Sequence, residues 1–291
     1  MRAIILAGGN GTRLYPSTIA VSKQLLPVYN KPMIYYPMST IMLAGIRDIL
    51  LITKPEDTSH FHNLLGDGSD LGISLNYAVQ TTANGIPEAL SIGRHFLGME
   101  QALLVLGDNI LFGTGLTPTF NIAKRALTGS AIFSYAVADP ERYGIVELNK
   151  DLTIKGICEK PKRPKSKLAI TGHYMLANDS IERVRELKKS ERGETEIIDL
   201  LKSYLKENAL THYRFGRGFA WFDSGTHSSL LEASRFVAMI ERRQGYMIAC
   251  LEEIALNNGW LDGSHVEELA RTKYTKTAYG SYLLDMLKET A

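Results

Sequence analysis

The feature that most constrains the fold of this chain is a glycine cluster that follows an apolar run near residue 1. Ala3 to Ala7 is apolar and of strand length, and Gly8-Gly9-Asn10-Gly11-Thr12-Arg13 comes directly after it. Glycines this close together let the backbone turn sharply and let another group approach it. Backbone N–H groups gathered in such a turn bind anions, and Arg13 and Lys23 add positive charge nearby. The pattern predicts a phosphate-binding loop after the first strand of an α/β sheet.

Two better-known glycine motifs do not fit this loop. A dinucleotide fingerprint that begins at Gly9 needs a glycine where the chain has Leu14. A P-loop that begins at Gly8 needs a glycine at position 13 followed by lysine, and the chain has Arg13 and Leu14 there. The alternative is a structural turn beside two solvated cations, because glycine-rich turns often connect regular elements without binding a ligand.

Composition excludes several classes of protein. The 291 residues suffice for one large α/β domain, or for a domain with an appendage. Lys+Arg 33 against Asp+Glu 31 gives a net charge of +2, so no general attraction to nucleic acid is expected. The basic stretch Lys162 to Lys167 lacks interleaved aromatic residues, which favours a solvated loop over a nucleic-acid patch.

The sequence also bears on membrane insertion and on the state of the cysteines. No apolar stretch reaches the roughly 18 residues of a membrane span, so none is predicted. Cys158 and Cys250 are too few for a disulfide framework or a zinc site, and they favour a reduced, cytoplasmic setting.

Helix and strand patterns alternate along the first half of the chain. Apolar runs predict strands at 48–53, 74–79, 103–106 and 131–137, and amphipathic runs predict helices at 32–43, 56–65, 87–96 and 113–129. This alternation predicts an α/β fold with a mixed, mostly parallel sheet flanked by helices. Segments 143–148, 153–158 and 168–176 read as adjacent strands, in an antiparallel excursion or at a mixed edge. Helices are predicted at 180–189, 196–207 and 230–243, and short helices at 252–256, 266–270 and 279–287 form a C-terminal appendage.

Polar residues that follow predicted strands are the candidate ligand-binding residues, because open α/β sheets bind ligands there. Gln80 follows the strand 74–79, and its amide can read a base edge, although a solvated loop glutamine is the alternative. Asp108 follows a buried strand and Gly107, a position suited to Mg²⁺ beside a phosphate or to a simple turn. Asp223 lies between an aromatic strand and a glycine turn and is a second candidate Mg²⁺ ligand.

Glu159 and Lys160 form a further candidate pair. A carboxylate can bind sugar hydroxyls, and an ammonium can bind a phosphate as a point charge. Spacing alone does not separate this interpretation from a surface ion pair.

Taken in order, these motifs resemble those of the sugar-1-phosphate nucleotidylyltransferases, and within them the glucose-1-phosphate thymidylyltransferases. The resemblance spans nearly the whole chain. It rests on the glycine loop, Ser22-Lys23-Gln24-Leu25-Leu26-Pro27, Leu106-Gly107-Asp108-Asn109, Glu159-Lys160-Pro161, and Arg217-Gly218-Phe219-Ala220-Trp221 with Asp223, Gly225, Thr226 and His227.

The resemblance implies a domain organisation. It implies a Rossmann-like nucleotidyltransferase core over 1–245, with a nucleotide half at about 1–125 and a sugar-phosphate half at about 126–245. A small helical segment over 246–291 follows, and the usual assembly is a homotetramer.

The resemblance also implies roles for individual residues. The catalytic residues would be Arg13, Lys23, Asp108, Lys160 and Asp223, with Mg²⁺ held by Asp108 and Asp223. The nucleotide would be bound by Gly8, Gly11, Thr12, Arg13, Lys23, Gln24, Gln80, Gly85 and Asp108. The sugar phosphate would be bound by Asn109, Tyr143, Gly144, Glu159, Lys160, Ile170, Tyr174 and Trp221. A regulatory nucleotide site would use Arg217, Gly218, Glu253 and Ile254.

The implied reaction transfers a thymidylyl group from dTTP to glucose 1-phosphate, giving dTDP-glucose and pyrophosphate, as the first step of dTDP-sugar (for example dTDP-rhamnose) synthesis. Ile86 and Pro87 replace the family's usual Leu-Ala beside the base, so the same chemistry with UTP or another sugar 1-phosphate stays open. A non-catalytic, nucleotide-sugar-sensing homologue is the alternative of another class. It predicts loss of the charged residues, and all five of the catalytic candidates are present.

Overall fold

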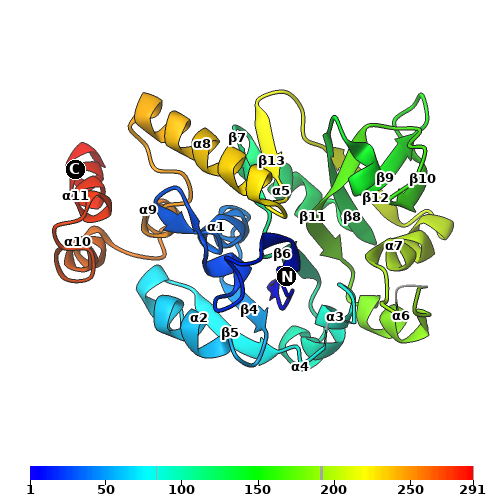
Figure 1. Cartoon of the computed structure of the whole chain (residues 1–291), viewed down its shortest axis with the longest axis horizontal. Coiled ribbons are helices and arrows are strands. Elements are labelled where there is room, and N and C mark those ends of the chain that lie inside the picture. The colour runs from blue at the N-terminus through cyan, green and yellow to red at the C-terminus, as the bar shows by residue number, and fades with distance from the viewer. Residues whose placement is uncertain (83, 191–192, 291) are drawn as a thin grey trace.

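A nine-stranded sheet runs through the centre of the protein (Figure 1). The structure is a computed structural model, and it describes residues 1–82, 84–190 and 193–290. The sheet contains β1 (Arg2–Ala7), β4 (Asp48–Thr53), β5 (Ser74–Val79), β6 (Ala102–Leu106), β8 (Ser130–Ala136), β9 (Gly144–Leu148), β10 (Ile154–Glu159), β11 (Leu168–Leu176) and β12 (Leu210–Arg214).

The sheet is mixed, with a parallel half and a largely antiparallel half. Strand β1 lies between β6 and β4, and β5 follows β4, all in parallel. Strand β11 then pairs antiparallel with β6, β8 and β9, and β10 pairs antiparallel with β9. The predicted fold class is therefore confirmed, including the change to antiparallel pairing after residue 143.

The central strands are apolar throughout because both faces of the sheet are covered. Along β1, Ala3 and Ile5 enter one buried cluster with the side chains of α1, and Ile4 enters a second cluster with Leu50 and Leu104. Ala3, Ile4 and Ile5 are each 0% exposed. A strand buried on both faces reads as a continuous hydrophobic run, which is why this segment lacks polar alternation.

Helices cover the sheet and extend beyond it. They are α1 (Tyr35–Leu43), α2 (Thr58–Leu65), α3 (Glu88–Ile92), α4 (Arg94–Leu97), α5 (Leu116–Arg125), α6 (Ser180–Glu186), α7 (Ile197–Lys206), α8 (His227–Gln244), α9 (Leu251–Asn257), α10 (Gly263–Thr272) and α11 (Ala278–Thr290). Figure 1 shows α10 and α11 at one end of the long axis and α6 and α7 at the other. Among the described residues, none of these helices is long and apolar enough to cross a membrane.

Several predicted elements differ from the structure. The helix expected at 87–96 is two short helices, α3 and α4, separated by Gly93, which sits against the sheet. A Cβ built on Gly93 would lie 2.7 Å from Ile4 Cδ1. The helix expected at 113–129 is shorter, because residues up to Gly113 form strand β7 (Ile110–Gly113).

Strand β7 belongs to a second, two-stranded sheet. It pairs antiparallel with β13 (Phe219–Phe222), which lies more than a hundred residues further along the chain. Another small sheet joins β2 (Pro27–Val28) to β3 (Lys31–Pro32). Sequence analysis did not predict β2, β3, β7 or β12.

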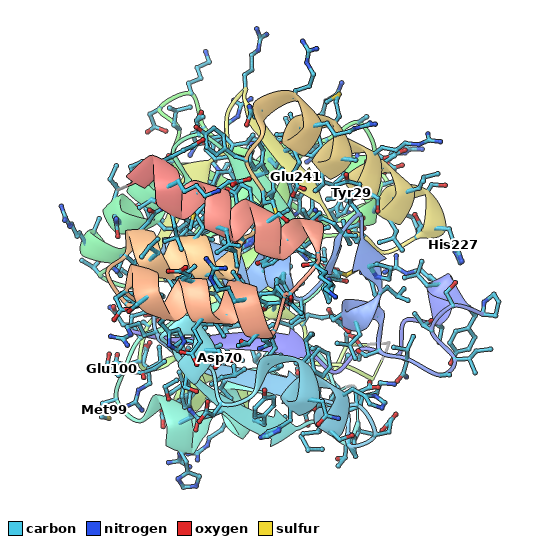
Figure 2. All side chains as sticks on the ribbon, turned by 90° about the vertical axis from the view of Figure 1, so that its left-hand side faces the viewer. Tyr29, Asp70, Met99, Glu100, His227 and Glu241 are labelled. Carbon is cyan, nitrogen blue, oxygen red and sulfur yellow. The ribbon has the colours of Figure 1, made fainter. Side chains whose placement is uncertain are left out.

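The long helix α8 holds the β2–β3 turn through a buried ion pair. Lys31 Nζ donates to Glu241 Oε1 at 2.9 Å, and Asn30 Nδ2 donates to Glu241 Oε2 at 2.7 Å. Figure 2 shows Glu241 and Tyr29 side by side where α8 passes this turn. Removing one partner of a buried ion pair leaves an uncompensated charge and costs roughly 3–5 kcal/mol. The pair therefore fixes α8 against the N-terminal part of the core.

Helices α10 and α11 lie at the end of the molecule, and α9 connects them to the core, where its Leu251 and Ala255 belong to the same buried cluster as α1. Helices α10 and α11 pack around a small cluster of Cys250, Val266, Ala270 and Leu283. Glu252 of α9 is 0% exposed, and it accepts hydrogen bonds from the Tyr274 and Tyr279 hydroxyls. The boundary placed at residue 245, and the division of the core into two halves, stay predictions.

Candidate active site

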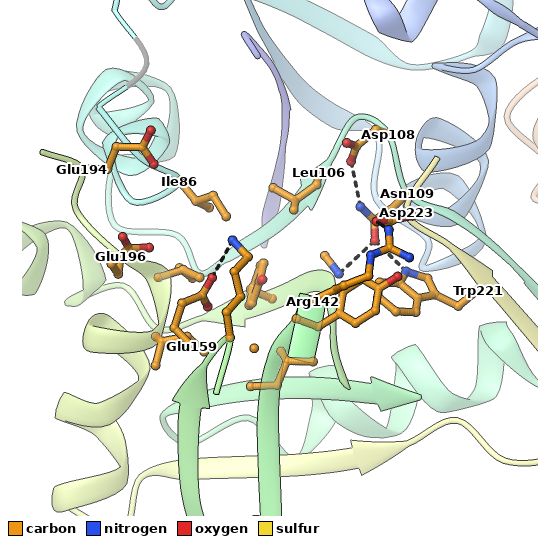
Figure 3. Close-up of a pocket in the computed structure, with 18 of the residues that line it drawn as sticks. Ile86, Leu106, Asp108, Asn109, Arg142, Glu159, Glu194, Glu196, Trp221 and Asp223 are labelled. Carbon is orange, nitrogen blue, oxygen red and sulfur yellow. Dashed lines mark hydrogen bonds and ion pairs between the residues drawn. The ribbon is translucent and has the colours of Figure 1, made fainter. Parts of the chain in front are cut away.

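The main pocket, so named because it gathers most of the predicted catalytic and substrate-binding residues, opens where the carboxyl end of β6 meets the antiparallel half of the sheet (Figure 3). Its volume is about 290 Å³, at the lower end of the range for small-molecule sites. Asp108, Asn109, Arg142, Trp221 and Asp223 lie on one side of it in Figure 3, and Ile86, Glu159, Glu194 and Glu196 lie on the other. Eleven predicted site residues line it: Arg13, Asp108, Asn109, Tyr143, Gly144, Glu159, Lys160, Ile170, Tyr174, Trp221 and Asp223.

The glycine loop reaches this pocket through Arg13, and Lys23 ties the loop to the pocket residue Asp108. Gly11 has a φ of 61°, in the left-handed region, and a Cβ built on it would lie 3.3 Å from Lys23 Cβ. Thr18 Oγ1 closes the loop by donating to the Gly11 carbonyl at 2.8 Å. Lys23 is buried, and its Nζ donates to Asp108 Oδ2 at 2.6 Å. The ion pair joins the loop after β1 to the turn after β6.

Asn109 is the central link of the pocket wall. Its Oδ1 accepts from Trp221 Nε1 at 2.6 Å and from the Gly172 N–H at 3.0 Å, and its Nδ2 donates to Asp108 Oδ1 at 2.9 Å. Asn109 is 2% exposed. A Cβ on Gly172 would lie 2.7 Å from this amide, so glycine is required there. Three segments distant in sequence are thereby held together at one side chain.

Asp223 lies among cations at the start of the turn after β13. Its Oδ2 accepts from Arg142 Nη2 at 2.9 Å. A Cβ on Gly225 would lie 3.0 Å from Arg13 Nη2 and 3.3 Å from Asp223 Oδ2, so both side chains pack against this glycine. Sequence analysis missed Arg142. Its position directly before Tyr143, a predicted pocket residue, was the available signal.

The carboxylates suit a hard divalent cation. Mg²⁺ prefers oxygen ligands and is usually held by one or two carboxylates together with substrate phosphates. Asp108 and Asp223 line the same pocket, and each is paired with a side-chain cation, Lys23 and Arg142 respectively. Within the described residues, no larger group of metal-ligating side chains gathers. The donor types, two carboxylates in one pocket, are those of a divalent-cation site that substrate phosphate would complete.

The opposite wall carries Glu159, Lys160 and Gly144, three of the predicted sugar-phosphate residues. Glu159 Oε1 pairs with Lys160 Nζ at 3.0 Å, and a Cβ on Gly144 would lie 3.2 Å from Glu159 Oε2. Lys160 has a φ of 40°, a conformation that non-glycine residues rarely adopt and that is concentrated at functional sites. Its N–H donates to the Tyr143 carbonyl at 3.0 Å, which holds the strained residue in place.

Two tyrosines in this wall stay protonated at neutral pH. Burial, with a smaller contribution from the Asp223 charge, raises the pKa of Tyr143 to about 12. Burial also raises the pKa of Tyr174 well above its usual value, with Glu159 acting in the same direction. Both hydroxyls are therefore neutral at pH 7, and that of Tyr143 interacts with Asp223.

The predicted base-reading residues lie beside the pocket rather than in its lining. A Cβ on Gly8 would lie 2.5 Å from Gln80 Oε1, and a Cβ on Gly107 would lie 3.1 Å from Gln24 Cγ. Both glutamines thus lie against the glycines that end β1 and β6. Gly8, Gly11, Thr12, Lys23, Gln24, Gln80 and Gly85 are absent from the residues that line the main pocket.

The predicted regulatory residues are not all in one place. Glu253 and Ile254 line another cavity, beside Gly115 and Met247, and burial raises the pKa of Glu253. Arg217 and Gly218 are exposed in the turn between β12 and β13 and do not line that cavity. A regulatory role for this set stays a prediction.

Comparison with known proteins identifies the family. Residues 2–239 match the model of the family described as nucleotidyl transferase. The chain belongs to this family. It is 55% identical over 289 residues to a glucose-1-phosphate thymidylyltransferase of Neisseria meningitidis, covering 99% of this chain and 100% of the relative. It is 49% identical over 288 residues to the protein of that name in Mycobacterium tuberculosis, covering 99% of each.

Two solved structures show the same fold. A Bacillus anthracis chain crystallised with sucrose, and assigned to the glucose-1-phosphate thymidylyltransferases, superposes with a TM-score of 0.75 at 38% identity, over 81% of this chain and 94% of that one. A UDP-glucose pyrophosphorylase bound to UDP-glucose superposes with a TM-score of 0.72 over 83% of this chain and 99% of that one. At 24% identity this second likeness shows the fold alone.

Proposed function

We propose that this nucleotidyltransferase transfers a thymidylyl group from dTTP to glucose 1-phosphate, giving dTDP-glucose and pyrophosphate. The observation that carries the proposal is one pocket that gathers two carboxylates, Asp108 and Asp223, with Arg13 and Lys160. Relatives at about half identity over nearly full length bear the name of this activity. The resulting nucleotide sugar would feed dTDP-sugar synthesis and, through it, polysaccharide synthesis.

The chemistry needs charge balance more than it needs a base. An oxygen of the sugar phosphate attacks the α-phosphorus of the nucleotide, the bond to the β-phosphate oxygen breaks, and pyrophosphate leaves. The nucleophile is already an anion at neutral pH, so the protein must bring two anions together and neutralise the charge that develops. Arg13 and Lys23 suit the nucleotide and its leaving group, and Lys160 suits the incoming phosphate.

Asp108 and Asp223 would hold Mg²⁺. When bound, the metal would neutralise phosphate charge and orient the reacting oxygens. Asn109 keeps Asp108 turned toward the pocket through its 2.9 Å hydrogen bond. Arg142, which bonds Asp223 at 2.9 Å, holds the second carboxylate in place from the other side.

The sugar would be held by the opposite wall. The Glu159 carboxylate suits sugar hydroxyls, and Tyr143 and Trp221, whose rings lie 5.1 Å apart, present an aromatic surface to the same pocket. Ile170 and Tyr174 complete the wall. The glycine loop, with Gly8, Gly11 and Thr12, would bind the nucleotide phosphates, and Gln24, Gln80 and Gly85 would bind the base.

The setting and assembly are part of the same proposal. Cys158 and Cys250 are free, which suits a reduced cytoplasm. We propose a homotetramer, which light scattering on the purified protein tests directly. A regulatory nucleotide at Glu253 and Ile254 would make dTDP-sugars inhibit the wild-type enzyme, and an enzyme indifferent to them would exclude it.

Pyrophosphate release with Mg²⁺ and glucose 1-phosphate, compared across dTTP, UTP, CTP, GTP and ATP, tests the function. Fastest release with dTTP supports dTDP-glucose as the product. Fastest release with UTP keeps the mechanism and assigns the change to Ile86 and Pro87, of which Ile86 lines the pocket. Absence of release with every nucleotide refutes glucose 1-phosphate as the substrate and favours another sugar phosphate or a sensing role.

A further inference from the structure

The side-chain amide of Gln80 is held in one orientation by a glutamate that no part of the proposed function uses. Gln80 is 5% exposed, and its Nε2 donates to Glu88 Oε2 at 2.5 Å. An ionised carboxylate is an acceptor only, so the amide nitrogen must face Glu88. The amide oxygen therefore faces the opposite way, toward the glycine loop. A Cβ built on Gly8 would lie 2.5 Å from Gln80 Oε1, which places this oxygen beside the loop.

Glu88 is itself fixed by its neighbours. Its second oxygen, Oε1, accepts from Asn84 Nδ2 at 2.8 Å. The carbonyl of Asn84 accepts from both the N–H and the Oγ1 of Thr195, each at 2.9 Å. Gly85 packs so closely here that a Cβ would lie 2.0 Å from the Thr195 carbonyl. The carboxylate thus has its two oxygens committed to two side-chain amides, and it cannot turn to accommodate a rotated Gln80.

Gln24 presents the complementary polarity. It is 4% exposed, and its Oε1 accepts from the Ser22 hydroxyl at 2.8 Å, which leaves its NH₂ group as the part that can meet a ligand. Gln80 packs against Gly8 and Gln24 against Gly107, the glycines that directly follow the paired strands β1 and β6, so the two amides lie at neighbouring strand ends. One amide offers an acceptor and the other offers a donor.

We propose that Glu88 is a positioning residue that sets base selectivity by fixing Gln80 as an acceptor. Thymine and uracil carry a donor at N3–H beside an acceptor at O4, which an acceptor–donor pair of glutamines matches. Cytosine carries an acceptor at N3 and a donor at N4, the reverse arrangement, so the fixed Gln80 oxygen would face a lone pair. The inference rests on the proposed function for its substrate, and it concerns the imide edge that thymine and uracil share.

The test is the ratio of kcat/KM for dTTP to that for CTP in Glu88→Leu, which removes the acceptor and frees the amide to rotate. A site that hydrogen-bonds one edge of a base disfavours a base with the reverse pattern, because polar groups of the site are then left unpaired. Each unpaired contact lowers kcat/KM by about 10- to 100-fold. We expect the ratio to fall by about that factor. Glu88→Gln, which can accept or donate, keeps the size of the side chain and should give a smaller fall.

Two controls separate positioning from a structural effect. Glu186→Gln removes the charge of an exposed glutamate far along the chain and should leave the ratio unchanged. In a Gln80→Met background, Glu88→Leu should change the ratio no further, because the amide that Glu88 orients is absent. A Glu88 variant that loses dTTP and CTP turnover equally, or keeps the wild-type ratio, overturns the proposal.

A binding measurement separates the proposed role of Glu88 from the proposed reaction. Binding of dTTP and of CTP is followed by tryptophan fluorescence in the absence of sugar phosphate. A wild-type preference for dTTP that shrinks in Glu88→Leu, in a protein with no turnover on any nucleotide, supports the role of Glu88 and refutes the proposed reaction. Turnover with equal use of dTTP and CTP in the wild type supports the reaction and refutes the role of Glu88.

Discussion

Asn109 offers the sharpest test of how the pocket wall is held together. In Asn109→Ala the Trp221 and Gly172 N–H groups both lose their acceptor, and both residues are buried. An unsatisfied buried donor costs about 1–3 kcal/mol, so the two together should lower the free energy of unfolding by roughly 2–6 kcal/mol. Because whole domains are stable by only about 5–15 kcal/mol, such a loss is readily measured.

Asn109→Asp separates stability from activity at the same position. An aspartate keeps an acceptor for Trp221 and Gly172, and it replaces the amide nitrogen that now bonds Asp108 at 2.9 Å with a second negative charge. Repulsion between two carboxylates at that distance amounts to several kcal/mol at an effective dielectric of about 20, and it would displace Asp108 from the metal position. We expect turnover to fall at least 100-fold, an effect of about 3 kcal/mol or more.

Urea unfolding followed by far-UV circular dichroism measures the first effect, and pyrophosphate release measures the second. The reasoning fails if Asn109→Ala stays within about 1 kcal/mol of the wild type, since the N–H groups would then have another partner. It fails equally if Asn109→Asp retains normal turnover, because Asp108 would then not depend on its neighbour.

Two further predictions concern the carboxylates and a buried histidine. Asp108→Asn and Asp223→Asn should each lower turnover by two or more orders of magnitude, roughly 3 kcal/mol of barrier, in the pyrophosphate assay, and near-normal turnover in either variant would remove that residue from the metal site. Burial lowers the pKa of His173 to about 3, and within the described residues its Nε2 has no hydrogen-bond partner. Below its ordinary pKa of about 6.5 the unfolded chain binds a proton that the folded chain does not, so stability falls by about 1.4 kcal/mol per pH unit as the pH drops toward 3. Between about pH 7.5 and pH 5, the free energy of unfolding should therefore fall by roughly 2 kcal/mol less in His173→Leu than in the wild type. Urea unfolding measures this difference, with the exposed His95→Leu as the control. Equal falls in the two variants would contradict the low pKa of His173.

The elements that the sequence predicted well are those whose environment is uniform. Strands β4 and β11 agree with the predicted 48–53 and 168–176 at both ends, because nearly all of their residues are buried between the two layers that cover the sheet. Strand β5 also agrees with the predicted 74–79, although it is an edge strand with exposed Ser74 and Asn76. The glycine loop was predictable for a related reason, since its residue types serve the backbone conformation itself. Gly11 has the positive φ that such a turn requires.

The elements that were missed depend on partners far away in sequence. Strand β7 is four residues long and is paired with β13, so nothing within its own window distinguishes it from the start of the following helix. Gly93 ends a helix early because the sheet lies beneath it, which no periodicity reveals. Residue types predict a local preference, and tertiary contact decides where that preference stops.

The same distinction explains what could be predicted of the site. Asp108 and Asp223 are predicted as acidic residues after strands, yet their partners Lys23 and Arg142 lie some eighty residues away in each case and become visible only in the folded chain. The direction of an amide is a finer property still. In a sequence, a glutamine can be donor or acceptor, and only the contact with Glu88 in the folded chain fixes which end of the Gln80 amide faces the glycine loop. Under the proposed role of Glu88, base selectivity is a property of a contact between side chains, and a substitution that leaves the glutamine intact is enough to alter it.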